Sequence, residues 1–309
     1  MDFYDRDLVS IRDLNKDQID SLLDLSEMMI PYAKGEKTSR ALDGKILGNL
    51  FFEPSTRTKL SFESAAHRLG CSVIDVSEMS MTSISKGETL ADTIKMVDAY
   101  CDVIVLRHPY EGAARLAADV SENPVINAGD GAGSHPTQTL LDLFTMREAK
   151  GTLEGLNVTL LGDLKYGRTV HSLAQALTLF GVNLTLVAPD SLQMPKDNVD
   201  TLCNKGCPPV ITDNLEDVIE QTDVLYVTRI QKERFPDPSE YRKVAGTYRI
   251  DNAALREAKK DMIIMHPLPR VNEIAPEVDT TLHARYFRQA FNGVPVRMAI
   301  LCAILGGKI

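Results

Sequence analysis

The sequence of 309 residues contains no tryptophan, and aromatic residues make up only 6% of it. Proteins that bind single-stranded nucleic acid commonly stack bases on aromatic side chains, and that platform is missing here. Basic residues are also few, since 34 Lys and Arg face 43 Asp and Glu for a net charge of −9. Nucleic acid and anionic membranes bind to basic surfaces, so the composition disfavours both partners. Taken alone, the same sum also argues against small anionic ligands.

Long apolar runs are lacking too. The longest covers residues 298–305, far short of the roughly 20 residues that span a bilayer, and no charged-then-apolar leader opens the chain. The five cysteines are an odd number, and a reducing cytoplasm is the simplest location. Cys203 and Cys207 have the spacing of half a zinc site, but no second pair lies nearby. We therefore expect inert thiols, no metal and no cofactor.

Short runs rich in Val, Ile and Leu alternate with segments of helical periodicity, which predicts an α/β fold with parallel sheets. Strands are expected at residues 46–52, 73–76, 103–106, 158–161, 184–187, 224–227 and 262–265. Helices are expected after a capping box of Asn15 and Gln18, at 59–69, 89–100, 137–150, 169–180, 215–221 and 252–259, and as a buried helix at 296–305. A glycine-bounded segment at 150–155 predicts a domain boundary, and the length suits two domains.

The segment 51–59 carries the first candidate site. Three hydroxyl residues and an arginine, Ser55-Thr56-Arg57-Thr58, follow an expected strand and open an expected helix. The unpaired N–H groups and the positive dipole of a helix N-terminus bind phosphate, and an arginine adds a bidentate contact. A helix cap needs only one such residue, so four in a row favour anion binding.

The segment 161–169 has the spacing of a nucleotide P-loop, again between a strand and a helix. Arg168 stands where the P-loop lysine belongs, and the strand at 224–227 runs into Thr228 and Arg229 rather than the aspartate that would hold magnesium. A nucleoside triphosphatase is therefore disfavoured. Arg168 is instead well placed to bind a carboxylate.

Three further segments place polar side chains after expected strands. They are 107–109 with Arg107, 228–231 with Arg229 and Gln231, and 266–270. A glycine-rich turn at 129–134 precedes His135 and Gln138, which suit contacts to a carbonyl and its amide nitrogen. In α/β sheets, ligands bind at the carboxyl ends of strands. The set has no obvious nucleophile–base pair or metal cage, so transfer between two small anions fits it best.

Taken together, these motifs resemble the aspartate/ornithine carbamoyltransferase family over nearly the whole chain. The run 229–234 and the sequence His-Pro-Leu-Pro-Arg at 266–270 look like its aspartate branch, and the Ser-Met-Gly and His-Cys-Leu-Pro motifs of the ornithine branch do not occur. The resemblance implies two domains, each a parallel sheet flanked by helices, with the active site in the cleft between them. Residues 1–150 and 288–309 would bind carbamoyl phosphate, and residues 151–287 would bind aspartate.

The resemblance also implies carbamoyl transfer from carbamoyl phosphate to the amino group of L-aspartate, in de novo pyrimidine biosynthesis. The attack would be direct, with a stabilised oxyanion and no covalent intermediate. The implied catalytic residues are Arg57, Thr58, Arg107 and His135. The carbamoyl phosphate site would add Ser55, Thr56, Gln138 and the backbone at Pro267, Leu268 and Pro269, and the carboxylates of aspartate would contact Arg168, Arg229 and Gln231.

In this family, a loop from a neighbouring chain of a homotrimer completes each site. Here the loop would be residues 81–88, with Lys86 as the borrowed cation and either Thr82 or Ser83 as its hydroxyl. Further candidates are an interdomain ion pair of Glu53 with Arg234 and a bridge from Glu240 to Lys165 and Tyr166. Separate regulatory chains are a possible further partner, on which any allosteric nucleotide site would lie.

Two alternatives stay open. One is an ornithine-type carbamoyltransferase, although two arginines suit the carboxylates of aspartate better than a cationic side chain. The other is a module that binds anions without turnover. In each case the net charge of −9 does not describe the site, because the cations that matter are local: Arg57, Lys86, Arg107, Arg168 and Arg229.

Overall fold

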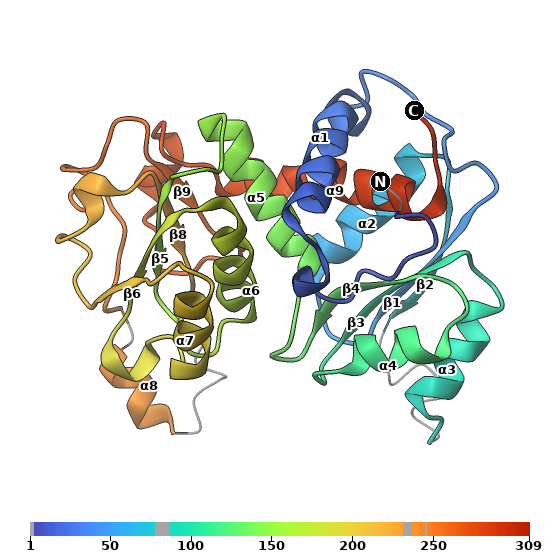
Figure 1. The fold of residues 1–309 in the computed structure, drawn as a ribbon, viewed down its shortest axis with the longest axis horizontal. Helices are drawn as coiled ribbons and strands as arrows, with labels where there is room; N and C mark the ends of the chain where they lie inside the picture. The colour runs from blue at the N-terminus through green and yellow to red at the C-terminus, as the bar shows by residue number, and fades with distance from the viewer. Residues whose placement is uncertain (1–2, 78–86, 231–236, 245) are drawn as a thin grey trace. The chain divides into compact units, whose positions relative to one another are not determined.

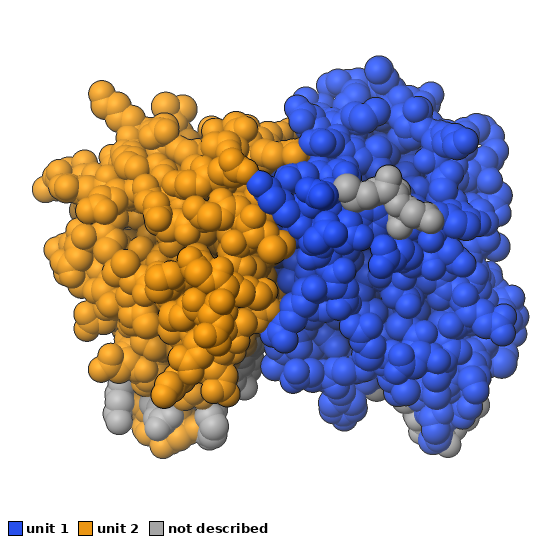
Figure 2. Space-filling view, in the orientation of Figure 1, with its two compact units in different colours: residues 1–144, 291–309 blue, residues 145–290 orange. Residues whose placement is uncertain are grey.

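The computed structural model describes residues 3–77, 87–230, 237–244 and 246–309. The chain divides into two compact units, residues 1–144 with 291–309 and residues 145–290 (Figure 2). These bounds differ by a few residues from the expected ones because helices α5 (Pro136–Lys150) and α9 (Tyr286–Leu305) run through the division without a break. No described helix is long and apolar enough to cross a membrane.

Unit 1 is built on a four-stranded parallel sheet in the order β2-β1-β3-β4. Its strands are β1 (Ile46–Phe51), β2 (Ser72–Ser77), β3 (Val103–His108) and β4 (Val125–Asp130). Helices α3 (Leu90–Asp98) and α4 (Ala113–Val120) cover one face, and α1 (Lys16–Ala33), α2 (Thr56–Arg68) and the last part of α9 cover the other (Figure 1). The buried last helix thus belongs with the N-terminal part of the chain.

Unit 2 repeats this architecture with one more strand, in the order β7-β6-β5-β8-β9. Its strands are β5 (Asn157–Leu161), β6 (Asn183–Val187), β7 (Val210–Thr212), β8 (Val224–Val227) and β9 (Ile263–Met265), and its helices include α6 (Arg168–Leu177), α7 (Lys196–Asn204) and α8 (Pro238–Val244). Every residue of β8 and β9 is buried. Burial on both faces explains why these strands are almost continuously apolar. The predicted α/β fold with parallel sheets is confirmed.

Local signals in the sequence located most elements. The capping box is present, because Gln18 N–H donates to the Asn15 side chain at 2.9 Å and Asn15 N–H to the Gln18 side chain at 3.0 Å. Strand β4 was missed because it contains polar residues, but Asn127 and Asp130 in it are hydrogen-bonded to each other at 2.9 Å. Strand β7, which has only three residues, and helices α4, α7 and α8 were missed as well.

Two helix predictions were wrong. Residues 252–259 form turns, and 215–221 form turns that end in a short 3₁₀ helix at Ile219–Gln221. In each case a side chain captures the first N–H groups of the segment. Asp251 accepts from the N–H groups of Ala253 and Ala254, and Asn214 accepts from that of Glu216. Bonds of this kind also cap helices, but in neither segment does the first turn continue into an α-helix.

An aspartate fixes the register of the central strand pair in each unit. Asp102, just before β3, accepts from the N–H of Ile46 and from the Lys45 ammonium, both at 2.8 Å. Asp223, just before β8, accepts from the N–H of Asn157 at 2.9 Å and from the Lys259 ammonium at 2.7 Å. Burial opposes the charged form of Asp102, but the hydrogen bonds from Lys45 and Ile46 outweigh it and lower the pKa.

We expect Asp102→Ala to lower the free energy of unfolding by about 1–3 kcal/mol at pH 7, because it leaves the Ile46 N–H without its acceptor. The pKa of Asp102 is lower in the folded state, so its contribution is complete above about pH 4 and is lost as the pH falls through the folded value. Urea unfolding at pH 7 and pH 3 measures both effects.

The matched control for this substitution is Asp43→Ala. The Asp43 side chain is 60% exposed and faces Arg40 at 3.4 Å, so its loss should change stability by less than about 0.5 kcal/mol. Equal effects of the two substitutions would contradict the role given to Asp102.

Candidate active site

The strand order of each sheet places two loops beside each other at a point where the topology reverses. In unit 1 the chain leaves β1 for β2 on one side and later returns to β3 on the other, and β5 and β8 stand in the same relation in unit 2. Parallel α/β sheets bind ligands at such switch points, outside the carboxyl ends of the strands. The residues that the sequence singled out lie after β1, β3, β4, β5, β8 and β9, and the loops after β1, β3, β5 and β8 meet at the two switch points.

The N-terminus of α2 forms one wall of the unit 1 site. Ser55 is the N-cap residue, but its side chain makes no capping hydrogen bond. Thr56, Arg57 and Thr58 occupy the first turn, whose N–H groups have no partner within the helix. Thr56 and Arg57 are exposed and Thr58 is buried. The hydroxyl of Ser55 is thus not used for capping, and the helix N-terminus offers donors to an anion.

Arg107, at the end of β3, extends the positive charge of this site. Its side chain is 11% exposed, donates to the carbonyl of Ala128 at 3.1 Å, and forms an ion pair with Glu53 at 3.2 Å. Glu53 therefore pairs with Arg107 in this structure, whereas the partner expected for it, Arg234, lies outside the described residues. A carboxylate next to this guanidinium marks a place where an anionic group is stabilised.

A tight loop after β4 positions His135. Asp130 anchors it by accepting from the N–H groups of Gly112 and Ser134, both at 2.9 Å. At Gly131, where φ is +49°, a Cβ atom would lie 2.6 Å from the backbone nitrogen of Glu111, so only glycine fits. His135 is buried, with Nδ1 3.5 Å from the Thr137 hydroxyl.

The switch point of unit 2 is equally close-packed. Gly162, with φ +114°, lies so near the next loop that a Cβ atom would be 2.4 Å from the carbonyl oxygen of Thr228. The Thr228 hydroxyl donates to the Leu161 carbonyl at 3.1 Å and accepts from the Asp163 N–H at 2.9 Å. These bonds join the loop after β5 to the loop after β8. Arg168 is buried at the first position of α6.

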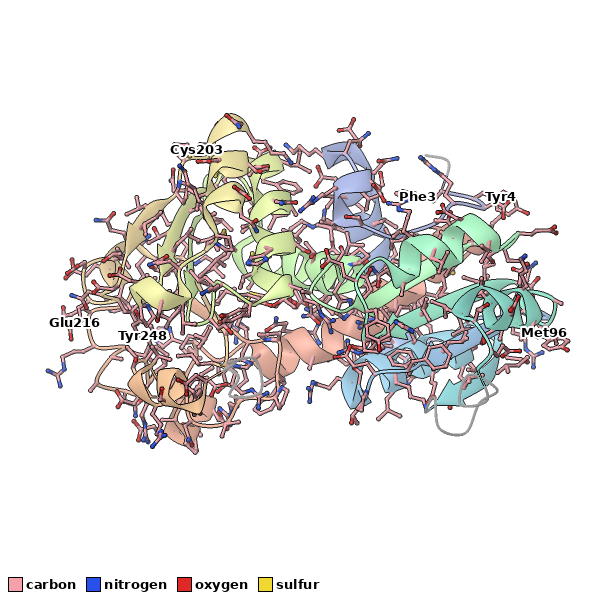
Figure 3. All side chains as sticks on the ribbon, turned by 90° about the horizontal axis from the view of Figure 1, so that it is seen from below. Phe3, Tyr4, Met96, Cys203, Glu216 and Tyr248 are labelled. Carbon is pink, nitrogen blue, oxygen red and sulfur yellow. The ribbon has the colours of Figure 1, made fainter. Side chains whose placement is uncertain are left out.

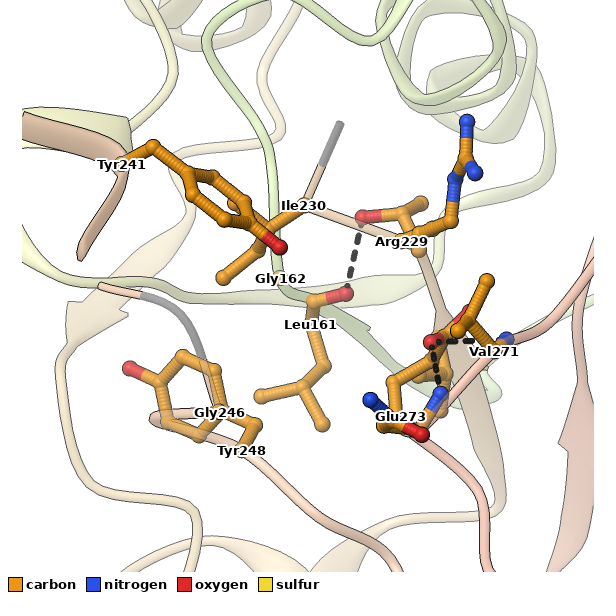
Figure 4. A pocket seen from close by; sticks show the side chains of 12 residues that line it. Leu161, Gly162, Arg229, Ile230, Tyr241, Gly246, Tyr248, Val271 and Glu273 are labelled. Carbon is orange, nitrogen blue, oxygen red and sulfur yellow. Dashed lines mark hydrogen bonds between the residues drawn. The ribbon is translucent and has the colours of Figure 1, made fainter. Parts of the chain in front are cut away.

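A cavity of about 370 Å³ opens beside these loops, all within unit 2 (Figure 4). Arg229, Tyr241, Tyr248 and Glu273 are among the residues that line it. Burial raises the pKa of Tyr248 to about 12, and its hydroxyl donates to the carbonyl of Asp213 at 2.7 Å. Tyr248 is therefore an uncharged side chain in the lining of the cavity, and Arg229 is a cationic one.

A buried histidine shapes the loop at 266–270. His266 Nδ1 accepts from the N–H of Leu268 at 2.7 Å, so Nε2 carries the proton and donates to Glu273 at 2.8 Å. Glu273 also accepts from the N–H groups of Val271 and Asn272. These bonds hold Leu268 at φ +56°, a left-handed conformation that is rare for leucine. The strained backbone supports a binding role for this segment.

Several predicted residues lie outside the described parts of the chain. They are Thr82, Ser83, Lys86, Gln231 and Arg234, and the side chain of Glu240 is also outside them. Lys165 lies with its ammonium 5.1 Å from the centre of the Tyr166 ring. Sequence analysis did not single out Asn127, Asp142, Glu273 or Arg297, all of which are buried polar residues near the predicted set.

The comparison with known proteins matches both units. Residues 6–148 match the carbamoyl-P binding domain of the aspartate/ornithine carbamoyltransferases, and residues 154–304 match their Asp/Orn binding domain. The chain belongs to the aspartate/ornithine carbamoyltransferase family. It is 57% identical to the aspartate carbamoyltransferase catalytic subunit of Methanocella arvoryzae over 100% of both chains, and 58% identical to that of Thermococcus kodakarensis over 99% of both.

Solved structures of this family agree. The chain is similar to the catalytic subunit of M. jannaschii aspartate transcarbamoylase, with a TM-score of 0.90 and 50% identity over 96% of each chain. It is also similar to aspartate transcarbamoylase from Trypanosoma cruzi in complex with N-(phosphonacetyl)-L-aspartic acid, with a TM-score of 0.93 and 42% identity over 98% of this chain and 97% of that one.

The described part of this family member contains no group of three or more His, Cys, Asp or Glu residues placed to hold a metal ion. All five cysteines are free. Cys203 is exposed on α7 and Cys207 is buried just beyond that helix (Figure 3). The helix N–H groups, hydroxyls and arginines at the switch points suit anion binding.

We expect Ser55→Ala to leave thermal stability unchanged, because its hydroxyl does not cap α2, and to weaken the binding of inorganic phosphate several-fold. Asn15→Ala is the matched control. It removes a capping box in another helix, so it should cost about 1 kcal/mol of stability and leave phosphate binding unchanged. Calorimetric titration and thermal unfolding of both variants measure the difference. Destabilisation by Ser55→Ala with normal phosphate binding would contradict the assignment.

Proposed function

We propose that this chain transfers the carbamoyl group of carbamoyl phosphate to the amino group of L-aspartate, giving N-carbamoyl-L-aspartate and phosphate. The observation that carries the proposal is the pair of switch points, each with an arginine where an anion binds: Arg107 in unit 1 and Arg229 in unit 2. The named relatives support it, and so does the T. cruzi enzyme, which has been crystallised in complex with carbamoyl phosphate and aspartate.

Unit 1 binds carbamoyl phosphate. The first turn of α2, from Ser55 to Thr58, and Arg107 hold the phosphate, because helix N–H groups, hydroxyls and a guanidinium all donate to its oxygens. Thr58, Arg107 and His135 polarise the carbamoyl carbonyl. Each contributes most when negative charge develops on that oxygen in the transition state.

Unit 2 binds aspartate. Arg168 and Arg229 pair with its two carboxylates, together with Gln231. Two fixed guanidinium groups favour a dicarboxylate and repel the cationic side chain of ornithine. The carbonyl groups of Pro267 and Leu268, in the segment that continues to Pro269, accept from the carbamoyl amide, as does Gln138.

The chemical step is a direct attack of the aspartate amine on the carbamoyl carbon. The C–N bond forms as the C–O bond to phosphate breaks, and the departing phosphate takes the proton of the amine. No covalent intermediate forms on the enzyme. The rate acceleration comes from the positioning of the two substrates and from stabilisation of the oxyanion. No cofactor takes part.

The active enzyme is a homotrimer in the cytoplasm. Lys86, with Thr82 or Ser83, reaches the site of a neighbouring chain and completes its aspartate side. The free thiols of the five cysteines suit a reducing compartment. Separate regulatory chains are proposed partners in an allosteric holoenzyme, and the product feeds de novo pyrimidine biosynthesis.

Incubation with carbamoyl phosphate and either L-aspartate or L-ornithine tests the reaction. We expect carbamoyl aspartate with the first acceptor and no citrulline with the second. Arg107→Ala should lower kcat/KM on the order of 100-fold or more, because it removes a donor to the developing oxyanion. Arg115→Ala, which removes a half-exposed arginine paired with Asp13, should leave it unchanged. Citrulline formation would identify an ornithine-type enzyme, and no product with either acceptor would identify a binding module.

Mixed trimers test the shared site. Homotrimers of Arg57→Ala and of Lys86→Ala should each be nearly inactive, because each lacks one part of every site. Dissociating and mixing them should restore part of the activity, since some sites then receive an intact residue from each chain. Formation of mixed trimers that stay inactive would rule out a borrowed Lys86.

A further inference from the structure

A layer of buried charge lies behind the residues that bind carbamoyl phosphate in unit 1. It consists of Asp142, which has no exposed surface, and Arg297, which is 2% exposed. Asp142 lies on α5 one helical turn after Gln138, and Arg297 lies on α9. Neither has a role in the reaction as proposed above. Burying charged side chains costs solvation energy, so the presence of these two at this place calls for a physical reason.

Arg297 is held on three sides. Its guanidinium lies 4.9 Å from the centre of the Phe62 ring and donates to the Thr137 hydroxyl at 3.3 Å. One turn earlier on α9, Gly293 makes room for it, because a Cβ atom there would lie 2.3 Å from the Nη1 atom of Arg297. Glycine inside a helix costs stability relative to alanine. In α9 this destabilising glycine lies where the buried guanidinium packs against the helix.

Asp142 is the counter-charge of this guanidinium. Burial is the main reason why the pKa of Arg297 falls to about 9; the charge of Asp142 opposes the fall and that of Arg107 adds to it. At neutral pH Arg297 thus carries its proton. In its carboxylate form, Asp142 can accept hydrogen bonds but cannot donate them.

This restriction decides which end of the Gln138 amide faces outward. Gln138 Nε2 donates to Asp142 Oδ1 at 2.9 Å. A carboxylate can only take the NH₂ end of an amide. The carbonyl oxygen of Gln138 is therefore left to accept a hydrogen bond from a ligand. With a neutral partner that both donates and accepts, the amide could equally turn its NH₂ group outward.

We propose that Asp142 is a positioning residue that fixes Gln138 as a hydrogen-bond acceptor, and that it thereby makes the site select a carbamoyl over an acetyl phosphate. The inference rests on the proposed function. Carbamoyl phosphate carries NH₂ where acetyl phosphate carries CH₃, and the two are otherwise nearly the same size and charge. Only the NH₂ group can donate to the Gln138 carbonyl. A site that is built to hydrogen-bond an N–H group strongly rejects an analogue without that group, because the acceptor in the site is then left unpaired.

The test measures the affinities of wild-type protein and Asp142→Ala for carbamoyl phosphate, acetyl phosphate and inorganic phosphate by calorimetric titration. Wild-type protein should prefer carbamoyl over acetyl phosphate. In the variant this preference should fall by about tenfold, the worth of one buried hydrogen bond, through weaker binding of carbamoyl phosphate alone. If Asp142 had a merely structural role, its removal would lower the affinity for all three ligands in parallel. That result would overturn the proposal.

Two further variants make the result specific. Asp102→Ala removes an ion-paired aspartate from the amino ends of the strands in the same unit, and it should leave the preference unchanged. In a Gln138→Met background, Asp142→Ala should cause no further loss of preference, because the acceptor is already gone. An undiminished effect in that background would contradict the mechanism.

Asp142→Ala leaves a buried arginine without its counter-charge, which can prevent folding. Asp142→Ala/Arg297→Met removes both charges and avoids that penalty. It should show the same loss of preference, and an unchanged preference in this folded variant would overturn the inference. Formation of carbamoyl aspartate by wild-type protein is assayed in parallel. Its absence would overturn the proposed function, whereas an active wild type with an unchanged preference in the variants would overturn only the role of Asp142.

Discussion

The reversal of strand order in each parallel sheet is the constraint on which the candidate site depends. Strands β1 and β3 are neighbours in space although the chain forms β2 between them, and β5 and β8 are neighbours although it forms β6 and β7 between them. Their carboxyl ends therefore lie side by side, and the loops that follow them must diverge. Asp102 and Asp223 fix the same pairs at the amino ends, through the first N–H of the neighbouring strand. One end of each pair is thus held by acceptors, and the other end offers donors to a ligand.

The electrostatics of the site follow from this arrangement and not from the total charge. The chain carries −9 overall, yet the switch point of unit 1 gathers a helix N-terminus and Arg107. In this structure Glu53 forms an ion pair with that guanidinium. Low-dielectric walls around such a site focus its field. An acidic protein can therefore bind two anionic substrates, and its acidic surface keeps polyanions of other kinds away.

The sequence located the elements and residues whose signals are local. Asn15 and Gln18 marked the start of α1 because a capping box involves only neighbouring residues. The serine, threonines and arginine at 55–58 predicted an anion site because they coincide with a helix start, and α2 does begin at Thr56. Local signals failed at residues 252–259, where Asp251 caps a first turn that does not continue into a helix. They failed too where polar residues satisfy one another in the core, as in β4.

Some roles depend on contacts across long stretches of sequence. The hydrogen bond from Arg297 to Thr137 joins residues 160 positions apart, and Gly293 is required only because that arginine folds back against it. The Thr228 hydroxyl donates to the carbonyl of Leu161, which lies 67 residues earlier in the chain at the end of β5. The sequence by itself determined the α/β class and the family, and it predicted the residues of the site, because motif and periodicity are properties of neighbouring residues. The tertiary structure alone decided which buried partners orient them, because a hydrogen bond between distant residues exists only after the chain has folded.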